Sequence, residues 1–395
     1  MTRLSRAQLQ ERNRARMLAA AAEEFAERGF RDAKIDAIAE RAELTRGAVY
    51  SNFPGKRALY FTVLADLAER APEPPDPEPS LTPREALGAF ARAWLARLPL
   101  TTDERHGLAR IGVDLMPEIL ADERTRRPFA QLTKLNAILL GLALERLRPP
   151  ATPGGRLMRV AEATLTTLHG ASQLAAAAPG FTDPFTIVGA CERLAGLDLD
   201  DRWPSTPWIP RARPADEAWS PPPAVDAVRG EPARLTGDGG DGVVAILGLH
   251  RLEAAEEAVR AAPAGAAITA VLVTGDPGEL APLARLAVAD FRGCLRQAFP
   301  PSAWPRLQVV LDDSGALAAA AGVPAVSDAT EAAVRVEAGR IVVRADGRGA
   351  CHTAASTPGG AVAGETPAGG AGRPAPAMAT DSRPGAGSPA RGFAG

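Results

Sequence analysis

The stretch IDAIAERAELTRGAVYSNFPGKRALYFTVL, residues 35–64, decides the fold, together with AAAEEFAERGF at residues 20–30. Apolar residues recur in both at steps of three and four, which places them on one face of a helix. Gly29 follows the first run, where a left-handed C-cap is favoured. The sequence predicts a first long helix, short helices over about 34–42 and 45–53, and, after the break at Pro54-Gly55, a fourth helix over about 56–70.

The connection between the two short helices is the most informative feature. Only Ala42-Glu43-Leu44 separates them, and Thr45 is a good N-cap for the second of the pair. This is the spacing of a helix-turn-helix, whose second helix enters the major groove of DNA. A compact three-helix element packed around Phe53 is the structural alternative. The predicted DNA-binding residues are Lys34, Thr45, Arg46, Gly47, Ala48, Tyr50, Ser51, Asn52 and Lys56.

Charge and side-chain chemistry agree with this interpretation. The whole chain has a net charge of -2, but its first 60 residues carry twelve Lys/Arg and eight Asp/Glu, which gives +4 there and -6 elsewhere. Arg46 is suited to a bidentate contact with guanine or to a phosphate contact. Tyr50 and Lys56 are placed to bond phosphates.

The run from Arg14 to Leu64 resembles the TetR/AcrR family of bacterial regulators. The two quoted stretches carry the resemblance, above all Ala48-Val49-Tyr50 through Phe53, then Lys56 and Leu59. The resemblance implies a homodimer that binds double-stranded, palindromic operator DNA as a repressor. It also implies that a small-molecule inducer enters the helical domain and releases the DNA.

Two positions depart from the family pattern. Glu43 occupies the turn position where the family usually has glycine, so the backbone must adopt a positive φ there or shift. Glu43 would also lower DNA affinity if it faced a phosphate. Ala33-Lys34 replace the usual hydroxyl residues at the start of the second helix.

Helical patterns continue through residues 81–199, which we interpret as the ligand-binding and dimerisation domain. They cover about 86–98, 104–120, 128–148, 156–178 and 184–194. The resemblance implies that the last two form the dimer interface. Core packing and an inducer pocket are alternative interpretations for a few polar or bulky residues. The pocket candidates are Trp94, Met116, Phe129, Asn136, His169 and Gln173.

The composition then changes twice. Residues 200–241 are rich in Pro and Gly and are interpreted as an extended linker, so few contacts are expected between the parts that it joins. Residues 242–352 predict strands at 243–249, 268–274 and 307–311, helices at 253–262, 282–299 and 315–321, and a hairpin over 332–344. Residues 353–395 lack apolar bulk and are expected to be disordered.

The α/β segment resembles a thioredoxin-like domain without redox cysteines. VVAILGL (243–249), VVLDDSGALAAAAGV (309–323) and VEAGRIVVRADG (336–347) carry the resemblance, and His250-Arg251-Leu252-Glu253 stands where active cysteines would be. We therefore expect an interaction module, although a redox-linked regulator or enzyme fusion is the alternative. Asp312-Asp313 suggests a metal or phosphoryl-acceptor site, but a turn is the better interpretation.

The predicted architecture is multidomain, with an all-α TetR-like part over the N-terminal two-thirds of the ordered chain, an α/β thioredoxin-like domain and a disordered tail. The three cysteines are scattered and form no CxxC, which fits a reducing cytoplasm. No apolar stretch of about 18 residues predicts a membrane span. We expect a cytoplasmic regulator with no enzymatic activity, cofactor, metal or membrane partner.

Overall fold

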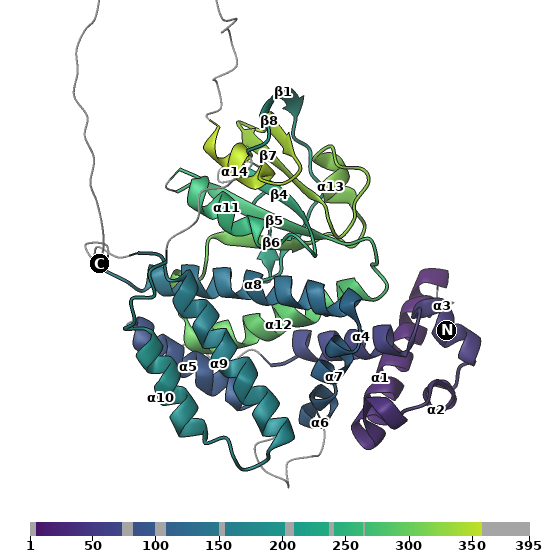
Figure 1. Ribbon diagram of the computed structural model, residues 1–395. Helices are drawn as coiled ribbons and strands as arrows, with labels where there is room; N and C mark the ends of the chain where they lie inside the picture. Colours follow the sequence, from purple (N-terminus) through teal and green to yellow (C-terminus); the bar gives the residue numbers. More distant parts are fainter. Residues whose placement is uncertain are drawn as a thin grey trace, which may run out of the picture. The chain divides into compact units, whose positions relative to one another are not determined.

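The computed structural model describes residues 5–72, 82–98, 108–149, 155–201, 209–236, 241–263 and 265–357. Ten helices lie in its N-terminal half, within the residues described (Figure 1). They are α1 (Arg6–Asp32), α2 (Ile35–Arg41), α3 (Arg46–Asn52), α4 (Lys56–Glu69), α5 (Pro83–Leu95), α6 (Leu108–Val113), α7 (Leu115–Leu120), α8 (Glu123–Arg146), α9 (Met158–Ala177) and α10 (Pro184–Leu194).

An aromatic core holds the first four helices together. The ring of Tyr60 lies 5.3 Å from that of Phe25 and 4.9 Å from that of Phe30, centroid to centroid. Gly29 has a φ of 73°, so the helical backbone is broken there as the sequence predicts. The amide of Phe30, freed by this break, donates a hydrogen bond of 2.6 Å to Oδ2 of Asp114. The segment around α6 and α7 therefore caps the break in α1.

A six-stranded mixed sheet follows the helices. Its order is β1-β8-β7-β4-β5-β6, with β4, β5 and β6 parallel and the other neighbours antiparallel. Its strands are β1 (Arg213–Ala218), β4 (Gly242–Gly248), β5 (Ala267–Val273), β6 (Leu307–Leu311), β7 (Glu331–Glu337) and β8 (Arg340–Asp346), and a separate pair is formed by β2 (Val225–Asp226) and β3 (Glu231–Pro232). The connecting helices are α11 (Ala254–Ala261), α12 (Leu280–Ala298), η2 (Pro301–Ala303), α13 (Ala316–Ala320) and α14 (Ala350–Ser356).

The element order predicted for residues 242–344 agrees with this sheet. The hairpin turns at Ala338 and Gly339, with φ values of 48° and 72°. The resemblance to a thioredoxin-like domain itself stays a prediction.

Because side chains alternate along a strand, β4 faces two cores. Val243, Ala245 and Leu247 share a core with the helices, whereas Val244 and Ile246 pack on the opposite side.

The prediction that residues 200–241 form an extended linker is wrong for much of their length. β1 pairs with β8 at the edge of the sheet, and the indole of Trp219 is buried and donates to the carbonyl of Leu235 at 2.6 Å. The strand RPADEA has no apolar alternation to reveal it. Backbone pairing stabilises it, with a cross-strand ion pair between Glu217 and Arg344 at 2.8 Å.

The predicted disordered tail also begins too early. Helix α14 extends to Ser356, and Thr353, Ala354 and Ala355 are buried. These small residues pack where α14 meets α11 and β7. The rest of the predicted tail, from residue 358, lies outside the described residues.

Helix α12 contradicts the expected independence of the two parts. Although it belongs to the α/β segment by sequence, it packs against α4, α5 and α8 (Figure 1). Phe291 is fully buried, and its ring centroid lies 5.8 Å from that of Phe90 on α5. The apolar residues of the helical part and of one sheet face therefore form one continuous core.

Polar contacts fix α12 within this core. Arg97 forms an ion pair with Asp290 and also donates to the carbonyl of Asp290 at 3.1 Å. Asn136 on α8 donates to the carbonyl of Ala287 at 3.2 Å. The predicted domain boundary after residue 199 therefore separates segments that share a core.

The cysteines Cys191, Cys294 and Cys351 are free and buried. Burial raises the thiol pKa of Cys191 to about 11. The same desolvation raises the pKa of Cys294 to about 11, against the opposing effect of the Arg97 guanidinium. Desolvation raises the pKa of Cys351 as well. All three are therefore protonated thiols near neutral pH, and a thiol is a poor nucleophile.

The shared core predicts a large effect of Phe291→Ala. The substitution should lower the free energy of unfolding by about 3–5 kcal/mol, because it leaves a cavity between α12 and α5. Urea unfolding followed by circular dichroism should show one cooperative transition. The exposed residue Leu120 supplies the control, and Leu120→Ala should change stability by no more than about 0.5 kcal/mol. Independent parts would instead give two transitions, with the helical one unchanged.

The buried thiols predict slow chemical modification. In the native protein at pH 8, a disulfide reagent such as dithionitrobenzoate should react slowly with all three cysteines, because both access and thiolate population are small. Unfolding in guanidinium should make all three react fast, which is the internal control. The native protein should also fail to catalyse insulin reduction. A native cysteine that reacts at the unfolded rate, or cysteine-dependent turnover, would support the redox alternative.

Candidate nucleic-acid interface

The turn between α2 and α3 is built on backbone hydrogen bonds. The amide of Leu44 donates to the carbonyl of Ala39 and that of Glu43 to Glu40, both at 2.9 Å. Glu43 has a φ of 52°, so of the two outcomes expected here, a positive φ or a shifted turn, the structure has the positive φ. Its carboxylate forms an ion pair with Arg16 on α1. The turn thus keeps helix-turn-helix geometry without glycine, at the conformational cost of a side chain in the left-handed region.

Helix α3 is anchored on one side and open on the other. Thr45 is its N-cap and accepts a hydrogen bond from the amide of Ala48 at 3.2 Å. Val49 and Phe53 are buried in the core. At Gly47 an added Cβ would meet only the Thr45 hydroxyl, at 3.8 Å, so nothing else stands over that point of the helix.

Arg46 and Tyr50 lie together on the exposed side of α3. The Arg46 guanidinium is 5.5 Å from the centre of the Tyr50 ring, and Tyr50 is 45% exposed. Arg46 also forms an ion pair of 3.2 Å with Asp36 on α2. Both partners of that pair are exposed, and such pairs contribute little stability, so the guanidinium can leave Asp36 for another anion at small cost.

Ser51 and Asn52 bond to their own helix. The Ser51 hydroxyl donates to the carbonyl of Ala48 at 2.9 Å, and the Asn52 amide nitrogen donates to the same carbonyl at 2.8 Å. Ala48 is itself half-buried. A DNA contact by Ser51 or Asn52 would need its side chain to change partner.

The ammonium group of Lys56 is engaged inside the protein, whereas a phosphate contact would need it to be available at the surface. Its ammonium donates to the carbonyls of Arg31 at 3.1 Å and Ala33 at 3.0 Å, and lies 4.6 Å from the ring centre of Phe30. It therefore holds α1 against the start of α4. Lys34 is exposed at the N-cap of α2 and makes no capping bond with its side chain.

The start of α4 offers further donors. Its N-cap is Gly55, which has no side chain to accept hydrogen bonds from the first backbone amides of α4. Those amides can therefore donate to an anion. Two basic residues on α1 that were not selected from the sequence also lie near the helix-turn-helix. Arg14 lies 4.9 Å from the ring centre of Phe53, and Arg16 forms the ion pair with Glu43 in the turn. Their signal was the run of arginines before the first apolar face.

Arg57 is another residue that was not selected from the sequence. In the first turn of α4, it bonds to Asp122 at 2.8 Å and forms an ion pair with Glu279. Asp122 is the N-cap of α8, and Glu279 is the N-cap of α12. Arg57 thus joins the base of the helix-turn-helix to both helices.

Half of the predicted ligand-pocket residues meet in the helical part. The His169 ring lies 4.9 Å from that of Trp94 and 5.7 Å from that of Phe129, in edge-on geometry. The Trp94 indole donates to the Ser172 hydroxyl at 2.9 Å. Burial lowers the pKa of His169, which favours its neutral form. These residues form a packed aromatic cluster.

The other three pocket candidates lie in different surroundings. Asn136 bonds to α12, and its Oδ1 is buried with no hydrogen-bond partner among the described residues. Gln173 is exposed, and Met116 is half-buried against the core. Their role in an inducer pocket stays a prediction.

Membrane spans and metal sites have no candidates among the described residues. None of the helices there is long and apolar enough to cross a membrane. No group of three or more His, Cys, Asp or Glu residues with metal-binding geometry occurs in that part of the chain.

Part of this chain is similar to several solved structures of bacterial regulators. A TetR transcriptional regulator from Rhodococcus sp. RHA1 is 18% identical, with a TM-score of 0.31, and covers 47% of this chain and 94% of its own. Native NalD, the secondary repressor of the MexAB-OprM multidrug efflux pump in Pseudomonas aeruginosa, is 23% identical, with a TM-score of 0.30, over 47% of this chain and 96% of its own.

Part of the chain matches a known family and two related proteins. Residues 17–63 match the family described as bacterial regulatory proteins, tetR family. The HTH-type transcriptional regulator YdgC of Bacillus subtilis is 30% identical over 129 residues, which are 31% of this chain and 63% of YdgC. The HTH-type transcriptional regulator TtgW of Pseudomonas putida is 45% identical over 65 residues, 16% of this chain and 48% of TtgW. The chain thus spans less than two thirds of the length of either relative. The N-terminal helices of this chain are thus similar to those of TetR-family bacterial regulatory proteins.

Proposed function

We propose that the protein is a DNA-binding transcriptional regulator that places α3 in the major groove of a palindromic operator. The observation that carries this proposal is the outward side of α3, where Arg46 and Tyr50 lie together beside the open backbone at Gly47. A guanidinium on such a helix can read guanine through two parallel hydrogen bonds. Tyr50 and the free amides at the start of α4 are suited to phosphate.

Homodimerisation is the second part of the proposal. Helix α10 is apolar, yet Cys191 is its one buried residue. Phe185 on α10 is 87% exposed, and Phe181, just before it, is 72% exposed. These two phenylalanines, one just before α10 and one in its first turn, are large apolar side chains left open to solvent, as is typical of a protein–protein interface. The family resemblance implies that α9 and α10 form the dimer interface. A second copy of the chain would cover the two phenylalanines.

We also propose that the protein acts as a repressor and that a small molecule releases it from DNA. Support comes from Arg57, which ties α4 to the N-caps of α8 and α12. A ligand that shifts either helix would therefore act on the helix that follows α3. The redox alternative has less support, because each cysteine is a buried thiol with a raised pKa.

The DNA-binding proposal is tested by selection from a randomised pool of DNA duplexes. The full-length protein should select a two-fold symmetric sequence, because a dimer presents two identical recognition helices. Arg46→Ala should then weaken binding by about 1–3 kcal/mol and relax selectivity at one base pair. Tyr50→Phe should weaken binding equally on all sequences. Electrophoretic mobility shift measures each affinity.

The matched control for Arg46→Ala is Arg84→Ala. Arg84 is an exposed cation on α5, away from the helix-turn-helix. Its replacement should leave DNA affinity unchanged. Equal affinity for the Arg46 and Arg84 variants, with both folded by circular dichroism, would exclude α3 as the recognition helix.

The dimer proposal predicts that Phe185→Glu makes the protein monomeric. A charge in an apolar interface is costly to desolvate, so the dissociation constant should rise by a hundredfold or more, on the order of 3 kcal/mol. Sedimentation velocity measures the mass, and DNA affinity should fall because two half-sites no longer bind together. Leu120→Glu is the control, since Leu120 is exposed on α7. A Phe185→Glu dimer would place the interface elsewhere.

A further inference from the structure

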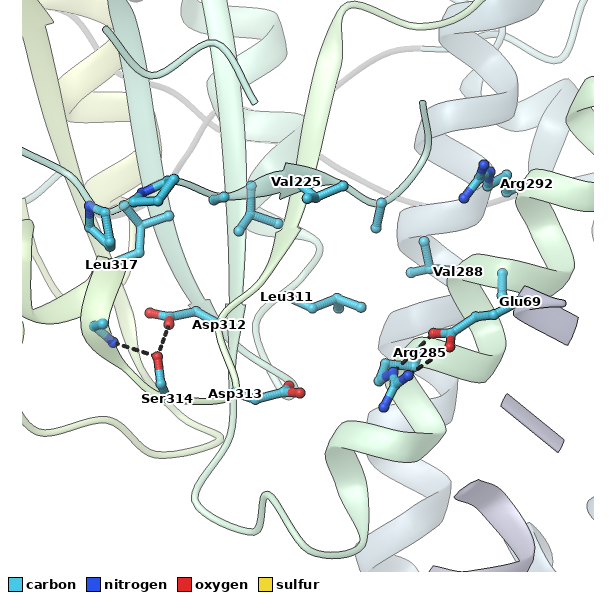
Figure 2. A pocket seen from close by; sticks show the side chains of 17 residues that line it. Glu69, Val225, Arg285, Val288, Arg292, Leu311, Asp312, Asp313, Ser314 and Leu317 are labelled. Atoms are coloured by element: carbon cyan, nitrogen blue, oxygen red, sulfur yellow. Dashed lines mark hydrogen bonds and ion pairs between the residues drawn. The ribbon is translucent and has the colours of Figure 1, made fainter. Parts of the chain in front are cut away.

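A cleft of about 620 Å³ lies between α12, the end of β6 and the segment around β2 (Figure 2). Its volume falls in the range of small-molecule sites. The apolar part of its wall includes Val225, Val288 and Leu311, and Glu69 at the end of α4 also lines it. None of the pocket residues predicted from the sequence lines this cleft.

Most of the charged groups in the cleft have partners. Arg285 makes two bonds to the carboxylate of Glu69, at 2.9 and 2.6 Å. Asp312 accepts from the amide of Ala318 at 2.8 Å and from the Ser314 hydroxyl at 3.3 Å, so it shapes the turn into α13 as the sequence suggested. Arg292 lies against the backbone at Gly230, where an added Cβ would meet its guanidinium at 2.5 Å.

Asp313 differs from these groups. It lines the cleft opposite α12, and none of the other lining residues hydrogen-bonds to its carboxylate (Figure 2). Desolvation raises the pKa of its carboxyl group, and the positive charge of Arg285, whose guanidinium is bonded to Glu69, opposes that shift. The cleft thus offers one carboxylate with open acceptor sites beside an apolar wall.

We propose that this cleft binds a small organic cation with an apolar body. The ammonium group would donate to Asp313, and the hydrocarbon part would lie against Val225, Val288 and Leu311. A hydrogen bond between two ionised groups is among the stronger polar contacts, and apolar contact adds to it. An organic anion is disfavoured, because it would face Asp312 and Asp313 while Arg285 is held by Glu69.

Occupancy of the cleft would reach the DNA-binding helices through α4. One ion pair joins each end of α4 to the α12 region, Arg57 to Glu279 and Glu69 to Arg285. A cation beside Asp313 repels Arg285 and competes with it for carboxylate partners, which loosens the second pair. This consequence rests on the proposed function, whereas binding to the cleft does not.

The test uses hexylammonium as the probe and the full-length protein, with isothermal titration calorimetry as the measurement. Hexanol and hexanoate have the same chain length without the positive charge, and both should bind at least tenfold more weakly than hexylammonium. Asp313→Asn should weaken hexylammonium binding about tenfold or more, the loss expected for one charge-assisted hydrogen bond. Asp241→Asn removes an exposed carboxylate outside the cleft and should change nothing.

A second variant guards against an indirect effect of the charge change. Val225→Trp fills the cleft from its exposed side and should abolish hexylammonium binding with Asp313 intact. Equal binding of the three probes, absence of hexylammonium binding, or full binding by Asp313→Asn would overturn the site.

DNA affinity is measured separately, with and without hexylammonium. A severalfold change that Asp313→Asn removes supports the coupling, and an unchanged affinity overturns the coupling. If the protein binds no DNA under any condition, the proposed function fails, and the calorimetric result still decides the site.

Discussion

The burial of α12 among α4, α5 and α8 is the constraint on which the rest of the structure depends. Phe291 meets Phe90 there, and Arg97 pairs with Asp290 close to Cys294. Desolvation raises the pKa of Asp290, and the Arg97 guanidinium opposes that shift. The pair is partly exposed, with side-chain exposures of 42% for Arg97 and 27% for Asp290, so it adds little stability and α12 is held mainly by its apolar contacts. The sheet and the helical part are therefore parts of one folding unit.

This arrangement places α4 between the first helix of the DNA-binding part and α12. One side of α4 closes the aromatic core of the helix-turn-helix through Tyr60, and another packs on α12. Arg57 links α4 to Glu279, the N-cap of α12, and Glu69 links it to Arg285 within α12. The helix that follows α3 thus bonds to residues 222 and 216 positions later in the sequence.

Local structure was largely predictable because it is encoded locally. The strand at 307–311 and the helix at 184–194 have the predicted bounds, since apolar patterns and the N-cap Asp183 define them. At Glu43 the turn spacing allowed a positive φ or a shifted turn, and the structure has the positive φ. These features depend on residues within a few positions of one another.

The sequence could not reveal which of several possible contacts a helix, strand or side chain makes. The apolar pattern of α12 suits packing on a sheet or on helices, and nothing local says that it does both. β1 was missed because an exposed edge strand needs only backbone pairing and charged neighbours. The engagement of Lys56 by two carbonyls was equally hidden, because a phosphate contact and an internal contact require the same side chain.

The place of α12 in the chain also orders events during synthesis. The helices that carry the DNA-binding surface leave the ribosome first, but the core they pack on includes residues 280–298. Until that segment emerges, the surface around Phe90 stays uncovered and open to chaperones or to aggregation. Because these contacts join distant parts of the chain, closing the bundle is a late and slow step. A nascent protein whose translation stops before residue 298 is thereby left without the core that positions α4.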